Sequence, residues 1–188
     1  MSFRAAEAFR SLSRVYLDAV DPNVVTAGGT AAADLGGMIS SATNLVLGVE
    51  LYLKSLQLMA GSQPPKTHDL VQLFQAMPAD LQAEIRRRYE LILANSPGSG
   101  VASTLNLAVW WGDTPPASPP QDGAPEIGDH SLEAVLERNK DSFQIWRYLH
   151  ERGILEQFVY FSFEFRDLDA VASALRSLII EAQSDWPR

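Results

Sequence analysis

The sequence predicts an all-α protein, folded as an up-and-down bundle of four to five helices. Apolar residues recur at intervals of three or four through most of the chain, and the stretches between these patterns carry proline or glycine. Each helix must bury its apolar face, and antiparallel packing across short turns does this most simply. Two stretches depart from helix: a Pro- and Gly-rich segment at 96–130, predicted to be a long flexible loop, and an aromatic segment near 157–165, predicted to be a small extended element.

Length and composition indicate a single globular domain over residues 1–188. The chain is 46% hydrophobic and 20% charged, and a folded chain of this length buries about 70% of the surface that its unfolded form exposes. The absence of cysteine excludes disulfides, thiolate metal ligands and cysteine nucleophiles. No run approaches the ~18 apolar residues of a membrane span, and "MSFRAAEAFR" does not resemble a secretory signal, so we expect a cytoplasmic protein with no membrane contact.

The net charge of −8 bears on the choice of partner. Phosphate backbones are attracted by positive potential, so an acidic chain is not expected to coat nucleic acid, and we expect no DNA partner. The run Arg86–Arg88 is flanked by Glu84 and Glu90, and its three side chains point in different directions on a helix. A solvated helix face explains this run better than a nucleic-acid site does.

The first predicted helix ends before Pro22, because the residue before a proline disfavours helix. Its expected buried face is formed by Phe9, Leu12, Tyr16 and Val20.

A long amphipathic helix follows, with the clearest periodicity in the chain. Its apolar face comprises Leu45, Val49, Tyr52, Leu56 and Met59. Glu50 and Lys54 are spaced as a helical i,i+4 ion pair. Gly36 and Gly37 leave its start open, whereas Gly61 and the turn "SQPP" mark its end.

The turn leads into two further helices. Thr67 is the predicted N-cap of the first, with Asp69 in the first turn, where the helix dipole favours negative charge. Leu70, Leu73, Phe74 and Met77 would line its buried face. Pro78 suits the start of the next helix, whose buried residues would be Leu81, Ile85, Tyr89 and Ile92.

Helix resumes after the 96–130 segment. Within that segment "LNLAVWW" is apolar, as either an extended stretch or a helical turn. "SLEAVLERNKDSFQIWRYLHERG" reads as one helix beginning at Ser131. Phe161, Phe163 and Phe165 then alternate with polar residues, which is typical of an extended arm, and two such arms would be able to pair. A final helix carries Leu168, Val171, Leu175 and Leu178 on one side.

The order of these motifs resembles the HEPN family of helical nucleotide- and RNA-handling domains. "ELYLKSLQLMAG" matches the Glu-x-x-x-Lys helix of that family, and "KTHDLVQLF" matches its Thr-His-Asp-Leu start after a proline turn. "SFQIWRYLHE" is similar to a Trp-Arg-Tyr motif in an uncharacterised bacterial branch of HEPN-like proteins. The resemblance covers roughly residues 40–180.

The resemblance implies a homodimer that acts in RNA handling or in stress or phage defence. Many HEPN proteins are metal-independent endoribonucleases whose arginine and histidine lie four to six residues apart on a late helix. That spacing is absent here, and the nearest approach is Arg147 with His150. If the chain is catalytic, His150 would act as acid or base and Arg147 would hold phosphate. The alternative is a non-catalytic module that binds a nucleotide or RNA, or mediates protein interaction and dimerisation.

The candidate ligand-binding residues are Glu50, Lys54, His68, Asp69 and Glu151. For each, a structural role competes with the functional one. His68 is explained by helix initiation beside Thr67. Arg147 is explained by a buried ion pair with an acid such as Glu50. Three scattered histidines indicate neither a metal site nor a cofactor.

Overall fold

The computed structural model describes residues 3–17, 32–95, 105–110, 128–147 and 158–184, and these are mostly helical. The helices are α1 (Phe3–Leu17), α3 (Ala32–Met59), α4 (Leu70–Gln75), α5 (Ala79–Asn95), α6 (Leu132–Arg138), α7 (Ser142–Arg147) and α9 (Phe165–Ser184). Two strands, β1 (Leu105–Trp110) and β2 (Phe158–Phe163), form an antiparallel sheet. The described chain is therefore mostly helical with one small sheet.

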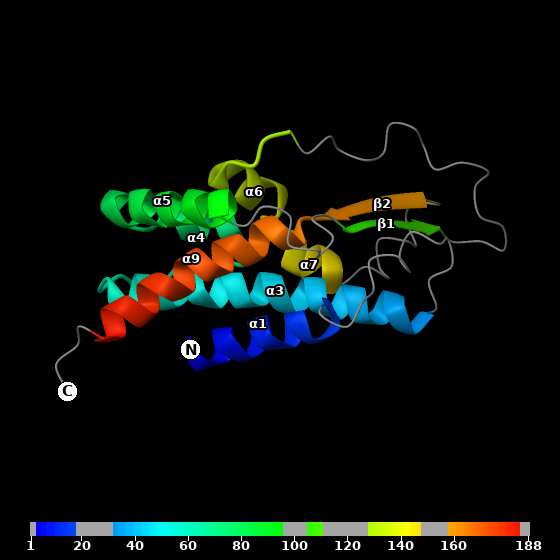
Figure 1. The fold of residues 1–188 in the computed structure, drawn as a ribbon, viewed down its shortest axis with the longest axis horizontal. Helices are drawn as coiled ribbons and strands as arrows, with labels where there is room; N and C mark the ends of the chain where they lie inside the picture. Colours follow the sequence, from blue (N-terminus) through cyan, green and yellow to red (C-terminus); the bar gives the residue numbers. More distant parts are fainter. Residues whose placement is uncertain (1–2, 18–31, 96–104, 111–127, 148–157, 185–188) are drawn as a thin grey trace.

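The long helix α3 is the centre of the packing. It contacts α1 on one side and α9 on the other, and α9 in turn packs against α5 (Figure 1). The short helices α4 and α7 also pack on α3, and α6 bridges α4, α5 and α9. The continuous helix from Ala32 shows that Gly36 and Gly37 are accommodated inside α3.

The face that α1 buries matches the predicted one only in part, at Phe9, which is partly buried against the core. Leu12 is 55% exposed, whereas Ala6 and Ser13 are fully buried. The backbone of α1 runs close to α3 at Gly48, where an added Cβ would lie 3.4 Å from Arg10 N and 3.5 Å from Ala6 O. Small residues thus form this contact, and a pattern of large apolar residues could not reveal it. Val20 and the side chain of Tyr16 lie outside the described part of the chain.

The end of α3 follows the prediction. Gly61 has a φ of 75°, Ser62 N donates to Gln57 O at 2.9 Å, and Gly61 N donates to Leu58 O at 3.1 Å. These two bonds form a Schellman motif, in which glycine supplies the left-handed residue at low cost. The chain then reverses so that α4 packs on α3, and its four predicted core residues are buried: Leu70, Leu73, Phe74 and Met77.

Replacing Gly61 with alanine should destabilise the fold by about 1 kcal/mol, because a Cβ disfavours the left-handed conformation. Urea denaturation measures this change. Gly128→Ala is the matched control, since Gly128 is exposed and an added Cβ there meets no atom within 4 Å. Equal stability of the two variants would show that the turn tolerates a side chain at Gly61.

The helix predicted from Ser131 is broken in two. Ser131 caps α6 as expected, with its Oγ accepting from Ala134 N, but the helix stops at Arg138. Asn139 then donates from its side chain to Val135 O at 2.9 Å and to Glu164 Oε2 at 3.0 Å, and α7 begins at Ser142. An asparagine that bonds locally in this way competes with helix continuation.

The sheet lies partly inside the predicted loop. Residues 105–110 form β1 and pair with β2, from Leu105 opposite Phe163 to Trp110 opposite Phe158. Of the two alternatives for "LNLAVWW", the extended stretch is therefore the one observed, and the loop predicted over 96–130 is interrupted there because backbone pairing with a distant segment satisfies its hydrogen bonds. The neighbouring residues 96–104 and 111–127 lie outside the described part. Strand β2 falls within the segment predicted to be extended.

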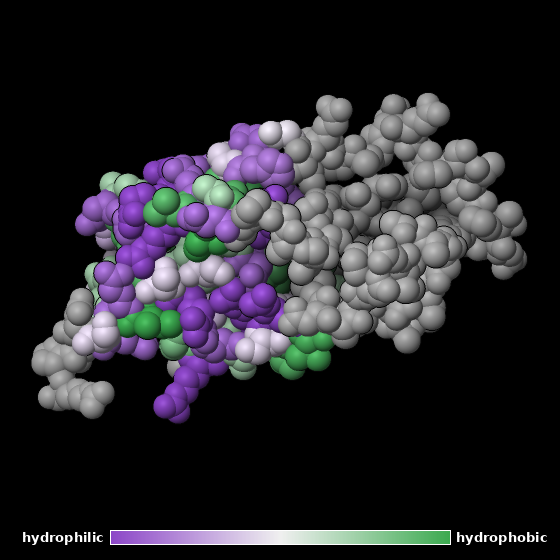
Figure 2. All heavy atoms as spheres, viewed as in Figure 1, coloured by the Kyte–Doolittle hydropathy of each residue, from purple (hydrophilic) through white to green (hydrophobic). Residues whose placement is uncertain are grey.

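Within the described ranges, no helix is long and apolar enough to cross a membrane. The surface facing the viewer in Figure 2 is largely hydrophilic where it is described, with apolar residues in separate spots. The large hydrophobic residues that are exposed are Leu12, Val15, Leu58, Leu91 and Ile180. Single exposed apolar residues of this kind are normal on folded proteins.

Candidate functional site

Three predicted ligand-binding residues meet at the turn between α3 and α4. The carboxylate of Glu50, whose side chain is only 3% exposed, accepts from Lys54 Nζ at 2.6 Å and lies 2.9 Å from His68 Nδ1. The predicted i,i+4 pair of Glu50 and Lys54 is thereby confirmed. His68 is half exposed, so its imidazole is held by a buried carboxylate while part of the ring reaches solvent. The role of His68 is thus a tertiary contact to α3 rather than a contact within its own turn.

Helix α7 completes this site. The ring of His68 stacks on Phe143, with centroids 4.9 Å apart and planes inclined by 26°. Helix α7, which ends with Trp146 and Arg147, packs on α3, the helix that carries Glu50. Arg147 ends α7, but its side chain, together with His150 and Glu151, lies outside the described part of the chain.

The N-cap of the helix after the proline turn is Asp69, so the prediction of Thr67 as the N-cap is wrong. Asp69 is the N-cap of α4, and its carboxylate accepts from Val71 N at 2.8 Å and Gln72 N at 3.0 Å. Thr67 instead accepts from Asp69 N at 3.0 Å, one step before the cap. Both residues suit an N-cap, and the sequence alone did not distinguish them.

The basic run on α5 is paired within the protein. Arg86 contacts Glu133 of α6, Arg87 contacts Glu84, and Arg88 contacts both Glu84 and Glu181 of α9. The Arg87 and Arg88 guanidiniums lower the pKa of Glu84 to about 2. Arg86 and Arg87 are exposed, as predicted for a solvated face, whereas Arg88 is only 19% exposed and links α5 to α9.

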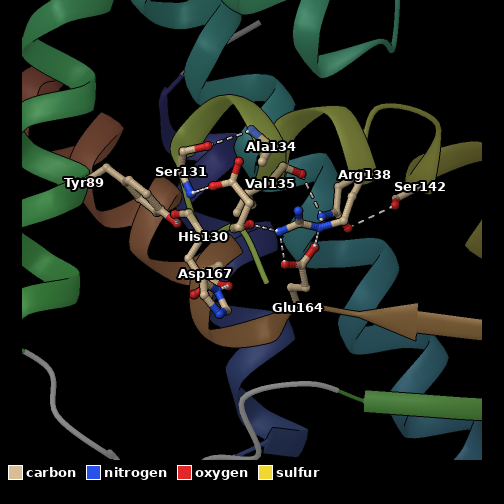
Figure 3. A network of polar contacts seen from close by, with 11 residues as sticks. Tyr89, His130, Ser131, Ala134, Val135, Arg138, Ser142, Glu164 and Asp167 are labelled. Atoms are coloured by element: carbon tan, nitrogen blue, oxygen red, sulfur yellow. Dashed lines mark hydrogen bonds and ion pairs between the residues drawn. The ribbon is translucent and has the colours of Figure 1, made fainter. Parts of the chain in front are cut away.

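A second polar group, shown in Figure 3, was not anticipated from the sequence. Glu164 links β2 to α9, and its side chain is 4% exposed. Arg138 of α6 makes a bidentate contact with this carboxylate: Nη2 donates to Oε1 at 2.7 Å, and Nε donates to Oε2 at 3.0 Å. Asn139 adds a third bond to Oε2. The Glu164 carboxylate raises the pKa of the Arg138 guanidinium.

Next to this pair, His130 lies against Asp167 in the first turn of α9. The distance from His130 Nδ1 to Asp167 Oδ2 is 2.7 Å, and the Asp167 side chain is 6% exposed while that of His130 is 52% exposed. Tyr89 of α5 donates its hydroxyl to His130 O at 2.8 Å and so holds the backbone of this segment. Burial, followed by the charges of Asp167 and Glu164, raises the pKa of Tyr89.

The sequence signal for this group is spread over three distant segments. Glu164 and Asp167 have the i,i+3 spacing that places two side chains on one helix face, which is the one local clue. His130 joins them only because α6 packs against α9. The scattered positions of the three histidines in the sequence give no sign of that contact.

Both groups share one chemical arrangement: a half-exposed imidazole whose Nδ1 lies against a buried carboxylate. Such a carboxylate fixes the orientation of the ring, which suits a histidine that moves protons or binds a ligand. The group at Glu50 adds a lysine ammonium, and the group at Asp167 adds a second carboxylate. Their ligand preferences should therefore differ.

Comparisons with family models, with curated proteins and with solved structures find no match to this chain. The class of this protein therefore rests on its fold and site alone. Its described residues form a mostly helical protein with two groups in which a half-exposed histidine lies against a buried carboxylate.

Proposed function

We propose that the chain is a HEPN-like domain that binds a phosphate-bearing ligand, RNA or a nucleotide, at the junction of α3, α4 and α7. The observation that supports this most is the group of Glu50, Lys54 and His68, since the motif residues that suggested the family meet in space. On this proposal the domain is cytoplasmic, forms a homodimer, and takes part in RNA handling or in stress or phage defence.

The chemistry of the group suits a phosphate. A lysine ammonium has three donors, and the bond to Glu50 uses one of them. The half-exposed imidazole of His68, held through Nδ1 by Glu50, would supply a second hydrogen-bonding group at the protein surface. The ring of Phe143 beneath His68 fixes the plane of the imidazole, so these donors are preorganised for a ligand.

Ribonuclease activity is the further step of this proposal. Attack of a ribose hydroxyl on phosphate needs a group that moves protons and a cation that stabilises the developing charge. In the proposal Arg147 and His150 supply these at the end of α7, and Glu50, Lys54, His68, Asp69 and Glu151 position the ligand. The packing of α7, which ends at Arg147, on α3, which carries Glu50 and Lys54, supports this arrangement.

A non-catalytic module is the second candidate, and the charge distribution favours it. The net charge is −8, and the arginines of the basic run on α5 are engaged with glutamates. A long RNA would meet repulsion over such a surface, whereas a nucleotide needs only a local positive group. This version of the proposal predicts binding of a small phosphate ligand without cleavage.

Binding is tested by titrating fluorescently labelled ATP and a short single-stranded RNA into the full chain at two salt concentrations. His68→Ala combined with Lys54→Met should weaken binding at least about tenfold, since each charged contact is worth about 1.5–3 kcal/mol. His130→Ala is the matched control, because it removes the other half-exposed histidine that lies on a buried carboxylate. Circular dichroism establishes that each variant is folded.

Cleavage is tested in chelator with Arg147→Ala and His150→Ala. Cleavage that both variants lose supports the ribonuclease, and binding without cleavage supports the non-catalytic module. If neither ATP nor RNA binds, or if His130→Ala weakens binding as much as the double variant, the proposed site is wrong.

A further inference from the structure

The group around Asp167 has the composition of a metal site. His130, Glu164 and Asp167 each offer one ligand atom, and these three atoms lie within 4.8 Å of one another. One nitrogen and two carboxylate oxygens are a ligand set that zinc accepts, with water in the remaining position. The side chains converge in Figure 3 from the segment before α6 and from the start of α9.

The charges and burial of this group favour the binding of a cation. Glu164 and Asp167 bring two carboxylates together, and both side chains are at most 6% exposed. Arg138 forms its fork with Glu164, while the contact described for Asp167 is with His130, which is charged only when protonated. The two carboxylates and the imidazole therefore form a set of converging donor atoms that a divalent cation would bridge.

We propose that His130, Glu164 and Asp167 bind a divalent transition-metal ion of the zinc class. The ion joins the segment before α6 to the first turn of α9, and water completes its coordination. Because the group is built from residues outside the proposed phosphate site, metal binding and phosphate binding are independent properties of the chain.

The existing contacts of Glu164 leave room for this ion. Oε1 accepts one described bond, from Arg138 Nη2, and a carboxylate oxygen has two lone pairs. The bonds from Arg138 and Asn139 would then orient the ligating carboxylate, as outer-shell partners do in metal sites. His130 precedes α6 and is half exposed, so it can shift to bring its nitrogen to the ~2.1 Å of a zinc bond.

The test uses the full chain after chelator treatment and buffer exchange. Equilibrium dialysis against Zn²⁺, followed by atomic absorption, should give about one ion per folded chain, with a rise in Tm. Cobalt substitution adds a spectroscopic readout, because tetrahedral Co²⁺ absorbs strongly in the visible range. His130→Ala should lower zinc affinity at least about tenfold and abolish the cobalt bands.

His68→Ala is the matched control and should retain zinc and the cobalt spectrum, since that histidine faces a glutamate and a lysine rather than two carboxylates. His130→Gln, which keeps the size of the side chain, supports the proposal if it is folded and loses zinc. The proposal is overturned if the parent chain takes up no zinc at tens of micromolar, or if His68→Ala loses as much affinity as His130→Ala.

Discussion

Arg138→Ala should lower the free energy of unfolding by about 3 kcal/mol, the low end of the cost of leaving one partner of a buried ion pair alone. Glu164 is the partner at risk, because its side chain is 4% exposed and Arg138 makes two bonds to it. The low end is expected because Asn139 still donates to Oε2 and because Arg138 itself is 28% exposed. Urea denaturation in chelator measures the loss.

Arg87→Ala is the control for this experiment. Arg87 makes a bidentate contact with Glu84, but it is 58% exposed, and solvent screens exposed ion pairs so that they contribute little to stability. A loss in Arg138→Ala no larger than in Arg87→Ala would contradict the view that Glu164 depends on its arginine. The loss of unfolding free energy in Arg138→Lys should lie between the losses in these two variants, since lysine keeps the charge but cannot make the bidentate contact.

Gly48→Leu should destabilise the protein by about 2–3 kcal/mol, even though leucine favours helix over glycine by about 1 kcal/mol. The reason is that the nearest atoms to a Cβ at Gly48 belong to the backbone of α1, at Ala6 and Arg10, which cannot rotate away. A larger side chain must therefore push the helix aside. Arg10 also bonds to Asp169 at 2.9 Å, so this displacement would strain the α1–α9 contact as well.

Gly48→Ala and Gly128→Leu separate the causes. An alanine Cβ at Gly48 would meet α1 at ordinary van der Waals distance, so Gly48→Ala should be neutral or more stable by up to about 1 kcal/mol. Leucine at Gly128 meets open space and should change stability by less than about 0.5 kcal/mol. If Gly48→Leu is as stable as the parent chain, α1 is not held closely on α3.

The fold was predictable where large apolar residues repeat and turn residues are distinctive. The buried face of α4 and the end of α3 at Gly61 followed from such local signals. The α1 contact did not, because Ala6 and Gly48 carry little apolar signal yet allow the helices to approach. The break at Asn139 depends on a bond to Glu164, 25 residues away, which no window of sequence contains.

The same distinction applies to the candidate sites. Glu50 and Lys54 are neighbours on one helix, so their pairing was predictable from spacing. The contact of His68 with Glu50 required the turn to reverse the chain, and Gly61 with the "SQPP" turn indicated that reversal. The His130 group combines residues from two segments that tertiary packing brings together, so it became visible in the structure alone.

The sheet links the start of α9 to a distant part of the chain. Strand β2 ends at Phe163 and α9 begins at Phe165, so Glu164 alone connects the strand to the helix. Because side chains alternate along a strand, a slip of one residue against β1 would turn the fully buried Phe163 outward. The same slip would shift the start of α9 relative to β1. The pairing register of residues 105–110 therefore determines the positions of the Glu164 and Asp167 carboxylates.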